Sequence, residues 1–96
     1  MLTHIVIWKY RDDAEPDVRK QHVNLLSGLA ARIPEIESWA VGSDVLRLPR
    51  SYHTGLVAVF KDRAALDAYT VHPEHQKVVE FGQAITEHIA SVDFEN

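Results

Sequence analysis

Two segments of strand length are apolar on both of their faces, and this feature restricts the folds open to the chain. Residues 2–10 are rich in β-branched and aromatic side chains, and residues 54–60 form a nearly unbroken apolar run. Strands of this kind are typical of a sheet that is covered on both sides. The chain must therefore build a sheet for which two covering layers are available.

Helix signals separate the predicted strands. Pro16 follows a polar turn and opens an amphipathic segment, which Pro34 brings to an end. Asp62 is a good N-cap for a second helix, and Pro73 suits the first position of a third. In chain order we expect a strand over 2–10, a helix over 16–32, strands over 36–42 and 54–60, helices over 62–69 and 73–89, and a closing strand over 90–94.

This β-α-β-β-α-α-β order is a split βαβ pattern with a broken second crossover helix. It predicts an α+β, ferredoxin-like fold in which helices cover one face of a four-stranded antiparallel sheet. The chain is expected to be a single domain over 1–96. Each apolar side chain left exposed on the second face, such as Ile5 or Ile7, forgoes roughly 1.5–3 kcal/mol of burial. We therefore expect a homodimer, with the two sheets packed face to face into a dimeric α+β barrel.

A phenol and two imidazoles gather within seven positions, where one helix stops and the next begins. Pro73 disfavours helical backbone at His72, which places His72 at the cap of the new helix. His75 starts the apolar stripe of that helix, and Tyr69 lies on the inward face of the helix before it. Both rings are aimed at one interior, where they need polar partners or a cavity.

Each of these rings also has a structural explanation. An inward histidine or tyrosine is commonly a satisfied core residue, and a cap before proline requires only a polar side chain at His72. His22 lies near the edge of the first helix's apolar stripe, so exposure to solvent is expected and contact with a cavity is the alternative. The two arginines in the loop over 43–52 are expected to be solvated.

Composition excludes several classes of function. The net charge of −4, with both signs scattered along the chain, lacks the basic stripe of a nucleic-acid groove. The absence of cysteine excludes disulfides, thiol nucleophiles and cysteine-based metal sites. No segment has the pattern of a secretory signal or a membrane span, so we expect a cytoplasmic protein without a membrane partner. His72, Glu74 and His75 form only a weak ligand set, so no metal and no cofactor are expected.

The sequence resembles the stress-responsive A/B barrel (Dabb) family. The resemblance covers essentially the whole chain, and its most specific part is the Tyr-x-x-His-Pro-x-His corner over 69–75. The other matching segments are residues 4–9, 33–34, 57–69 and 92–95.

The resemblance implies a dimeric α+β barrel of ferredoxin-like subunits, in agreement with the topology argued above. Members of the family include stress-associated plant proteins and a plant enzyme that cyclises a polyketide thioester by an aldol step without metal or cofactor. The catalytic tyrosine and histidine of that cyclase match Tyr69 and His75 here. Its pocket histidine on the first strand matches His4, and the histidine before proline matches His72.

Differences from the cyclase of this family imply a different substrate. Bulky aromatic residues that line the cyclase pocket correspond here to Val23 or Leu26 and to Thr86, and a pocket of different volume selects a different molecule. The residues expected to bind the substrate are His4, Val6, Trp8, Val23, Leu26, Leu56, His72, Thr86 and Ile89.

Two classes of function follow. In the first, His75 is a general base on a carbon next to a carbonyl, and Tyr69 donates a hydrogen bond to the enolate. The protein is then a cofactor-independent cyclase or lyase of a polyketide-like or carbonyl compound. In the second, the same dimer is a non-catalytic stress-responsive protein that binds an unidentified small molecule or has only a structural role. Turnover of a substrate distinguishes the two.

Overall fold

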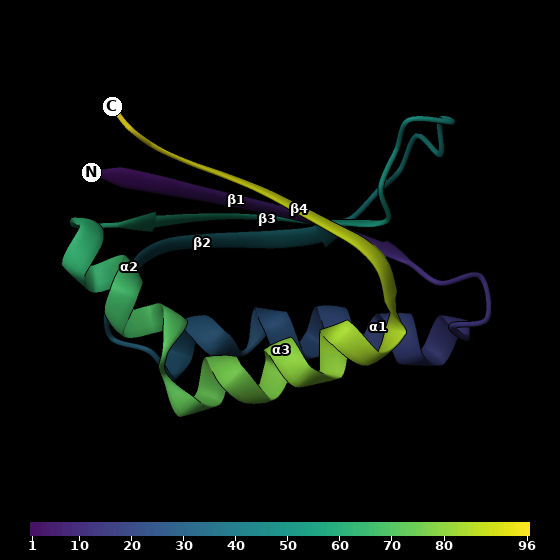
Figure 1. Ribbon diagram of the computed structural model, residues 1–96, viewed down its shortest axis with the longest axis horizontal. Coiled ribbons are helices and arrows are strands. Elements are labelled where there is room, and N and C mark those ends of the chain that lie inside the picture. Colours follow the sequence, from purple (N-terminus) through teal and green to yellow (C-terminus); the bar gives the residue numbers. More distant parts are fainter.

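The computed structural model describes residues 1–96 and shows a four-stranded sheet with its helices on one side (Figure 1). The strands lie in the order β2-β3-β1-β4, and every neighbouring pair is antiparallel. The predicted ferredoxin-like α+β fold is confirmed. The elements are β1 (Leu2–Tyr10), α1 (Pro16–Ser27), the 3-10 turn η1 (Leu29–Ala31), β2 (Ile36–Ser43), β3 (Thr54–Phe60), α2 (Arg63–Thr70), α3 (Pro73–Ile85) and β4 (Thr86–Glu95).

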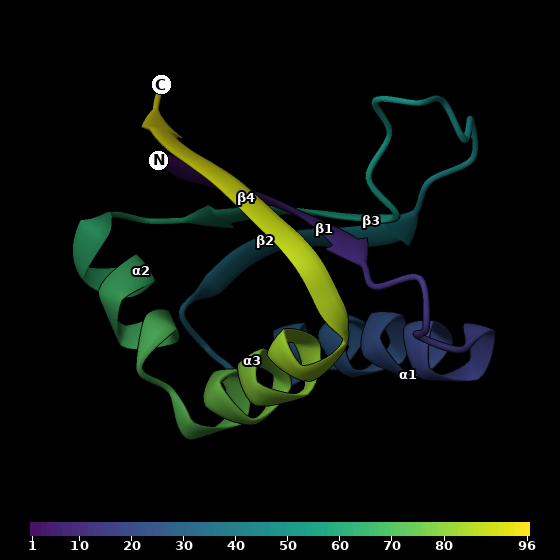
Figure 2. The same cartoon turned by 45° about the vertical axis from the view of Figure 1, so that its right-hand side comes forward.

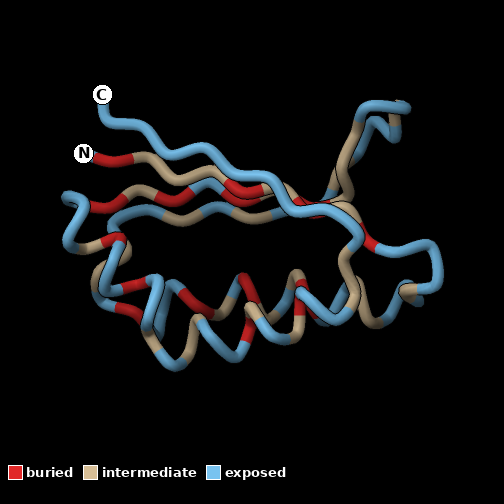
Figure 3. The backbone as a smooth tube through the Cα atoms, viewed as in Figure 1, coloured by how far each residue is buried: buried red, intermediate tan, exposed pale blue.

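The core lies between the helices and one face of the sheet. α1 and α3 contact each other beneath the sheet, while α2 and the loop between β2 and β3 lie at opposite ends of the molecule (Figure 2). Buried positions alternate along β1 and β3, as expected for strands with one face in the core (Figure 3). The core cluster comprises Leu2, Val6, Trp8, Leu26, Leu29, Ile33, Leu56, Ala58, Phe60, Leu66, Tyr69 and Val78.

The first and last helices are shorter than predicted. α1 stops at Ser27, because Gly28 is a weak helix former, and a short 3-10 turn follows. α3 stops at Ile85, and the extended backbone of Thr86 opens β4. β4 then pairs with β1 along the whole length of that strand. In the strand, backbone groups within residues 86–89 form hydrogen bonds with β1. In the predicted last turn of the helix, their carbonyl groups would have had no partner within the helix.

The expectation that His22 is exposed is wrong, because its side chain is only 1% exposed. Its Nδ1 atom lies 2.8 Å from the Tyr10 hydroxyl, which in turn lies 2.8 Å from the Thr54 hydroxyl. The ring also packs edge-on against Trp8, with 5.2 Å between the ring centroids. These partners come from β1 and β3, so the pattern of the helix alone does not reveal them. Burial lowers the pKa of His22 to about 4, which keeps the ring neutral at pH 7.

The other face of the sheet is apolar, and no element of the chain covers it. Ile5 pairs with Val57 on one side and with Val92 on the other, and all three lie on this outer face. Val57 is 44% exposed, Val92 54% and Phe94 42%. Several large apolar side chains on the outer face of the sheet are therefore in contact with water.

Gly82 allows α3 to approach the buried His22 ring, and its replacement by alanine is expected to destabilise the protein. A Cβ atom at this position would lie 2.8 Å from His22 Nε2, and the ring is held in place by Tyr10. Overpacking of this kind costs about 1–3 kcal/mol, which exceeds the helix preference for alanine. Urea denaturation of Gly82→Ala should show the loss. Gly28→Ala is the control, because a Cβ there meets only ordinary contacts at 3.7 Å; equal stabilities of the two variants would contradict this account.

Burial of neutral His22 should also make stability depend on pH. The unfolded chain binds a proton on this histidine below its ordinary pKa of 6.5, whereas the folded protein resists protonation down to about pH 4. The free energy of unfolding should therefore fall as pH drops from 6.5 towards 4, with about 3 kcal/mol of the loss due to this residue. Urea denaturation at pH 7.0 and 4.5 measures the fall, which should be smaller in His22→Leu. If the free energy of unfolding of His22→Leu falls as much as that of the parent, His22 is not the source of the pH dependence. The matched control is His88→Leu, because His88 is exposed, and this variant should show the same fall as the parent.

Candidate functional site

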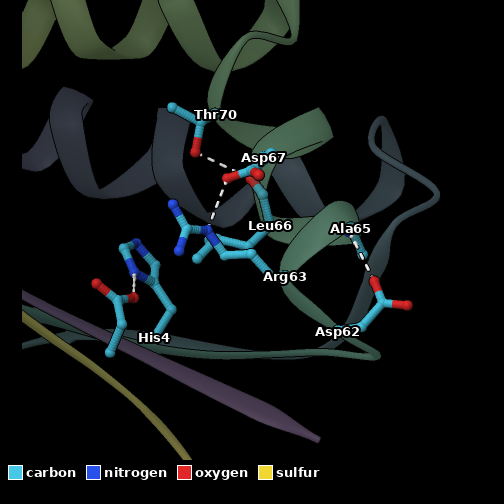
Figure 4. Close-up of polar contacts among 8 residues, drawn as sticks. His4, Asp62, Arg63, Ala65, Leu66, Asp67 and Thr70 are labelled. Atoms are coloured by element: carbon cyan, nitrogen blue, oxygen red, sulfur yellow. Dashed lines mark hydrogen bonds and ion pairs between the residues drawn. The ribbon is translucent and has the colours of Figure 1, made fainter.

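The corner between α2 and α3 is built by local signals in the chain. The Asp62 side chain begins α2 by accepting a hydrogen bond of 2.9 Å from the backbone N–H of Ala65 (Figure 4). After α2 ends, His72 has extended backbone and caps α3, with Pro73 as the first helical residue. This abrupt change of direction brings the last turn of α2 next to the first turn of α3. Tyr69 and His75 are thereby placed side by side.

Tyr69 is the most deeply buried member of the corner. Its side chain is 2% exposed and packs against Phe60, at 5.0 Å between ring centroids, and against Trp39, at 5.9 Å. Its hydroxyl has no hydrogen-bond partner within the protein, and no buried polar atom is left unsatisfied, so this oxygen retains a little accessible surface. Burial raises the pKa of Tyr69 well above its usual value of 10. The phenol is therefore protonated and available to donate a hydrogen bond.

His75 lies against Tyr69, with 4.1 Å between the ring centroids. Its Nδ1 atom lies 3.0 Å from the backbone carbonyl oxygen of Thr70. A carbonyl only accepts hydrogen bonds, so Nδ1 carries the proton and, in the neutral ring, Nε2 keeps a free lone pair. Burial lowers the pKa of His75, the Thr70 hydrogen bond opposes this shift, and the charges of His4 and His72 lower it further. The ring is therefore neutral at pH 7.

His4 reaches the corner from the central strand. Its side chain points from β1 towards α2 (Figure 4), and its ring lies edge-on to Tyr69 with 5.9 Å between centroids. The register of β1 and β4 sets His4 opposite Asp93, whose carboxylate is hydrogen-bonded to His4 Nδ1. A carboxylate on Nδ1 holds the proton there and fixes the orientation of the ring. The predicted convergence of His4, Tyr69 and His75 is thus present in the structure.

His72 lies at the same corner, but its ring is engaged with the backbone. Its Nδ1 atom accepts a hydrogen bond of 3.1 Å from the backbone N–H of Glu74. This contact satisfies one of the free donors at the start of α3. The geometry therefore gives His72 a capping role, whether or not its other nitrogen contacts a ligand.

The remaining predicted pocket residues lie in several parts of the molecule. Val6, Trp8, Leu26 and Leu56 are buried in the core, where they pack against other side chains. Thr86 ends α3 and donates a hydrogen bond of 2.8 Å to the Gly82 carbonyl oxygen. Two other predicted pocket residues lie elsewhere. Ile89 is 48% exposed on β4, and Val23 lines a cavity at the end of the molecule opposite the corner.

Three residues of the corner were missed by the analysis of the sequence. Phe60 and Trp39 close around Tyr69, and Asp93 pairs with His4. The inward phase of residues 54–60 identifies Phe60 as a core residue, but its neighbour on α2 is set by the tertiary structure. Asp93 is found only through the register between two strands that are about ninety residues apart in the sequence.

The corner brings together groups that suit acid–base chemistry. It combines a neutral imidazole with a free lone pair, a protonated phenol and a histidine held by a carboxylate. No group of three or more His, Asp or Glu side chains in the chain is arranged to hold a metal ion.

None of the three helices is both long and apolar enough to cross a membrane.

Solved structures similar to this chain share its whole fold. A dimeric ferredoxin-like protein from Thermobifida fusca is 27% identical, with a TM-score of 0.90 over 99% of this chain and 90% of that one. A dimeric ferredoxin-like protein from Jannaschia sp. is 31% identical, with a TM-score of 0.82 over 99% and 98% of the two chains. Hydroxynitrile lyase from Passiflora edulis is 16% identical, with a TM-score of 0.86 over 97% and 90%, and shows the likeness of fold alone.

Sequence comparisons give the family. A search of curated proteins found no match to the chain. The family model of the stress responsive A/B barrel domain, Dabb, matches residues 2–96, which include the corner and Asp93. The match spans every strand and helix described above. The chain therefore belongs to the stress responsive A/B barrel (Dabb) domain family.

Proposed function

We propose that this protein is a homodimer that binds a small carbonyl compound at the Tyr69–His75 corner and transfers a proton there. The observation that carries the proposal is the hydrogen bond from His75 Nδ1 to the Thr70 carbonyl, because it leaves the neutral ring with a basic Nε2. A base in this form at pH 7 suits proton abstraction from a carbon next to a carbonyl.

The proposed reaction needs only the side chains of the corner. His75 Nε2 removes a proton from the carbon next to a carbonyl, and the Tyr69 hydroxyl donates a hydrogen bond to the enolate oxygen that forms. The enolate carbon then attacks a second carbonyl carbon of the same molecule and forms a carbon–carbon bond. The new alkoxide takes the proton back from His75. His4, oriented by Asp93, lies close enough to Tyr69 to position the substrate or a water molecule.

This sequence of steps is an aldol cyclisation, and its reverse is a lyase reaction. The resemblance to the polyketide cyclase of the family supports the forward direction for a polyketide-like substrate. A protein of the same fold that is named hydroxynitrile lyase supports testing lyase substrates as well. The class of reaction proposed is therefore cofactor-independent cyclase or lyase chemistry.

A non-catalytic role is the second candidate, and the close packing of the corner favours it. The rings of Tyr69 and His75 are only 4.1 Å apart, and Phe60 and Trp39 pack against Tyr69 from the other side. A cavity of about 850 Å³ between α1 and the loop that joins β2 to β3 includes none of these residues. In this alternative the corner recognises a ligand and releases it unchanged, or serves only the architecture of the dimer.

The homodimer is proposed from the outer face of the sheet. This face carries Ile5, Val57 and Val92, and no element of the chain covers it. Burying one such side chain against a partner contributes about 1.5–3 kcal/mol, so several together favour association strongly. Similar structures from Thermobifida fusca and Jannaschia sp. are described as dimeric, which supports the same assembly here.

Replacement of the base should abolish proton transfer. The test is loss of the α-proton NMR signal of a 3-oxoacyl thioester dissolved in D2O, measured above the buffer rate. The parent protein should accelerate exchange, His75→Gln should lose about 10²-fold or more, and Tyr69→Phe about 10-fold or more. Because the pKa of His75 is lowered, the parent rate should be level near neutral pH and fall as pH drops below 6.5.

His88→Gln is the matched control for this experiment, since His88 is exposed and pairs with Lys9 at the far end of the sheet. Exchange at the same rate in the parent and in His75→Gln would contradict a catalytic corner. If these proteins nevertheless bind the thioester, as measured by thermal stabilisation, the non-catalytic alternative is supported.

Charge on the outer face of the sheet should separate the proposed dimer. Light scattering after size exclusion should give twice the 10.9 kDa chain mass for the parent, and a smaller mass for Val57→Lys and Val92→Lys. Val71→Lys is the control, because Val71 is 71% exposed but lies at the end of α2. A parent protein of monomer mass, or a dimer that survives both sheet substitutions, would rule out this interface.

A further inference from the structure

A cavity lies at the end of the molecule opposite the Tyr69–His75 corner. It measures about 850 Å³ and opens between the first turns of α1 and the loop that joins β2 to β3. Figure 2 shows this loop and α2 at opposite ends of the sheet. Pockets that bind small molecules have about 300–1,000 Å³, so the cavity is large enough for a ligand of its own.

The floor of the cavity is a buried polar network. Tyr10 and Thr54 both line the cavity, although their side chains are only 2% and 3% exposed. The Tyr10 hydroxyl is 2.8 Å from the Thr54 hydroxyl and 2.8 Å from His22 Nδ1. Since these groups satisfy one another, the floor is held rigidly without a ligand.

His53 forms one wall and has a hydrogen-bond donor to spare. Its ring stacks on Tyr10, with 5.5 Å between centroids and 21° between planes. Its Nδ1 atom accepts a hydrogen bond of 3.0 Å from the Tyr10 backbone N–H. The proton of the neutral ring is therefore on Nε2, and this N–H has no partner within the protein.

Positive charge surrounds this wall. The Arg19 guanidinium lies 5.4 Å from the centre of the Tyr10 ring and donates hydrogen bonds only to the backbone carbonyls of Ala14 and Arg11. Arg47 and Arg19 line the cavity, and neither forms an ion pair with a carboxylate.

The cavity is also lined by three acids, Asp12, Glu15 and Asp44, beside the bases Arg19, Lys20 and Arg47. Burial is the main cause of the lowered pKa of His53, and the charges of Arg19, Arg47 and Lys9 lower it further, whereas only Asp12 opposes them. Another acid, Asp44, is occupied as a loop cap and accepts a hydrogen bond of 2.7 Å from the Arg47 backbone N–H. Of the charged groups that act on His53, three are basic and one is acidic.

We propose that this cavity is a second ligand site, which binds a small organic anion through its carboxylate or phosphate oxygens. The anionic group lies against Arg19, Arg47 and the Nε2–H of His53. The organic part lies against Tyr52 and Leu48, which also line the cavity. Guanidinium groups suit both anions, because their planar fork matches two oxygens at once.

Calorimetric titration of the parent protein with benzoate, phenyl phosphate and benzyl alcohol tests the proposal. Both anions should bind, and the neutral alcohol should bind at least tenfold more weakly. Stronger binding of benzoate or of phenyl phosphate identifies which anion the site prefers. Failure of both anions to bind, or equal binding of the alcohol, would overturn the proposal.

Variants locate the binding. Arg47→Gln and His53→Gln should each weaken anion binding at least fivefold, with a thermal denaturation curve to show that the variant is folded. Arg50→Gln is the matched control, because Arg50 is exposed on the same loop but does not line the cavity. Equal weakening by Arg50→Gln would indicate unspecific attraction to charge and would overturn the assignment. His75→Gln should leave this binding unchanged, so the outcome is independent of the function proposed for the corner.

Discussion

The structure depends on its central strand, β1, which is apolar on both faces. This strand pairs with β3 and β4, directs Val6 and Trp8 into the core, and turns Ile5 and Ile7 to the outer face. Its two ends also support the two polar regions of the molecule: His4 reaches the corner between α2 and α3, and Tyr10 forms the floor of the large cavity. The nine residues of β1 thus separate two proposed sites that do not share a side chain.

The backbone selects opposite tautomers of two partly buried histidines, His75 at the corner and His53 in the cavity. A carbonyl of Thr70 holds the proton of His75 on Nδ1 and leaves Nε2 as a base, whereas the N–H of Tyr10 faces His53 Nδ1 and leaves Nε2 as a donor. Burial lowers the pKa of both rings and keeps them neutral at pH 7. His75 is accordingly suited to accept a proton. His53 is suited to donate a hydrogen bond to an anion, with no proton transfer.

Much of the fold and part of the corner could be predicted because their signals are local. Pro73 disfavours continuation of the helix before it and suits the first position of a new helix. The placement of Tyr69 beside His75 could therefore be predicted from the seven residues 69–75. The burial of His22 could not be predicted in this way, because its partners Tyr10 and Thr54 lie on strands. The same applies to the early end of α3, which is set by pairing of β4 with β1.

The sequence by itself determined the order of the elements, the α+β fold, the apolar outer face and the helix corner, since periodicity, caps and prolines act over a few residues. Only the tertiary structure decided that Asp93 holds His4, that Phe60 and Trp39 enclose Tyr69, and that a cavity of about 850 Å³ lies away from the corner. The physical reason is the same in each case. Strand register and the path of a loop bring distant residues together through many weak contacts, none of which is visible in the spacing of residues along one segment.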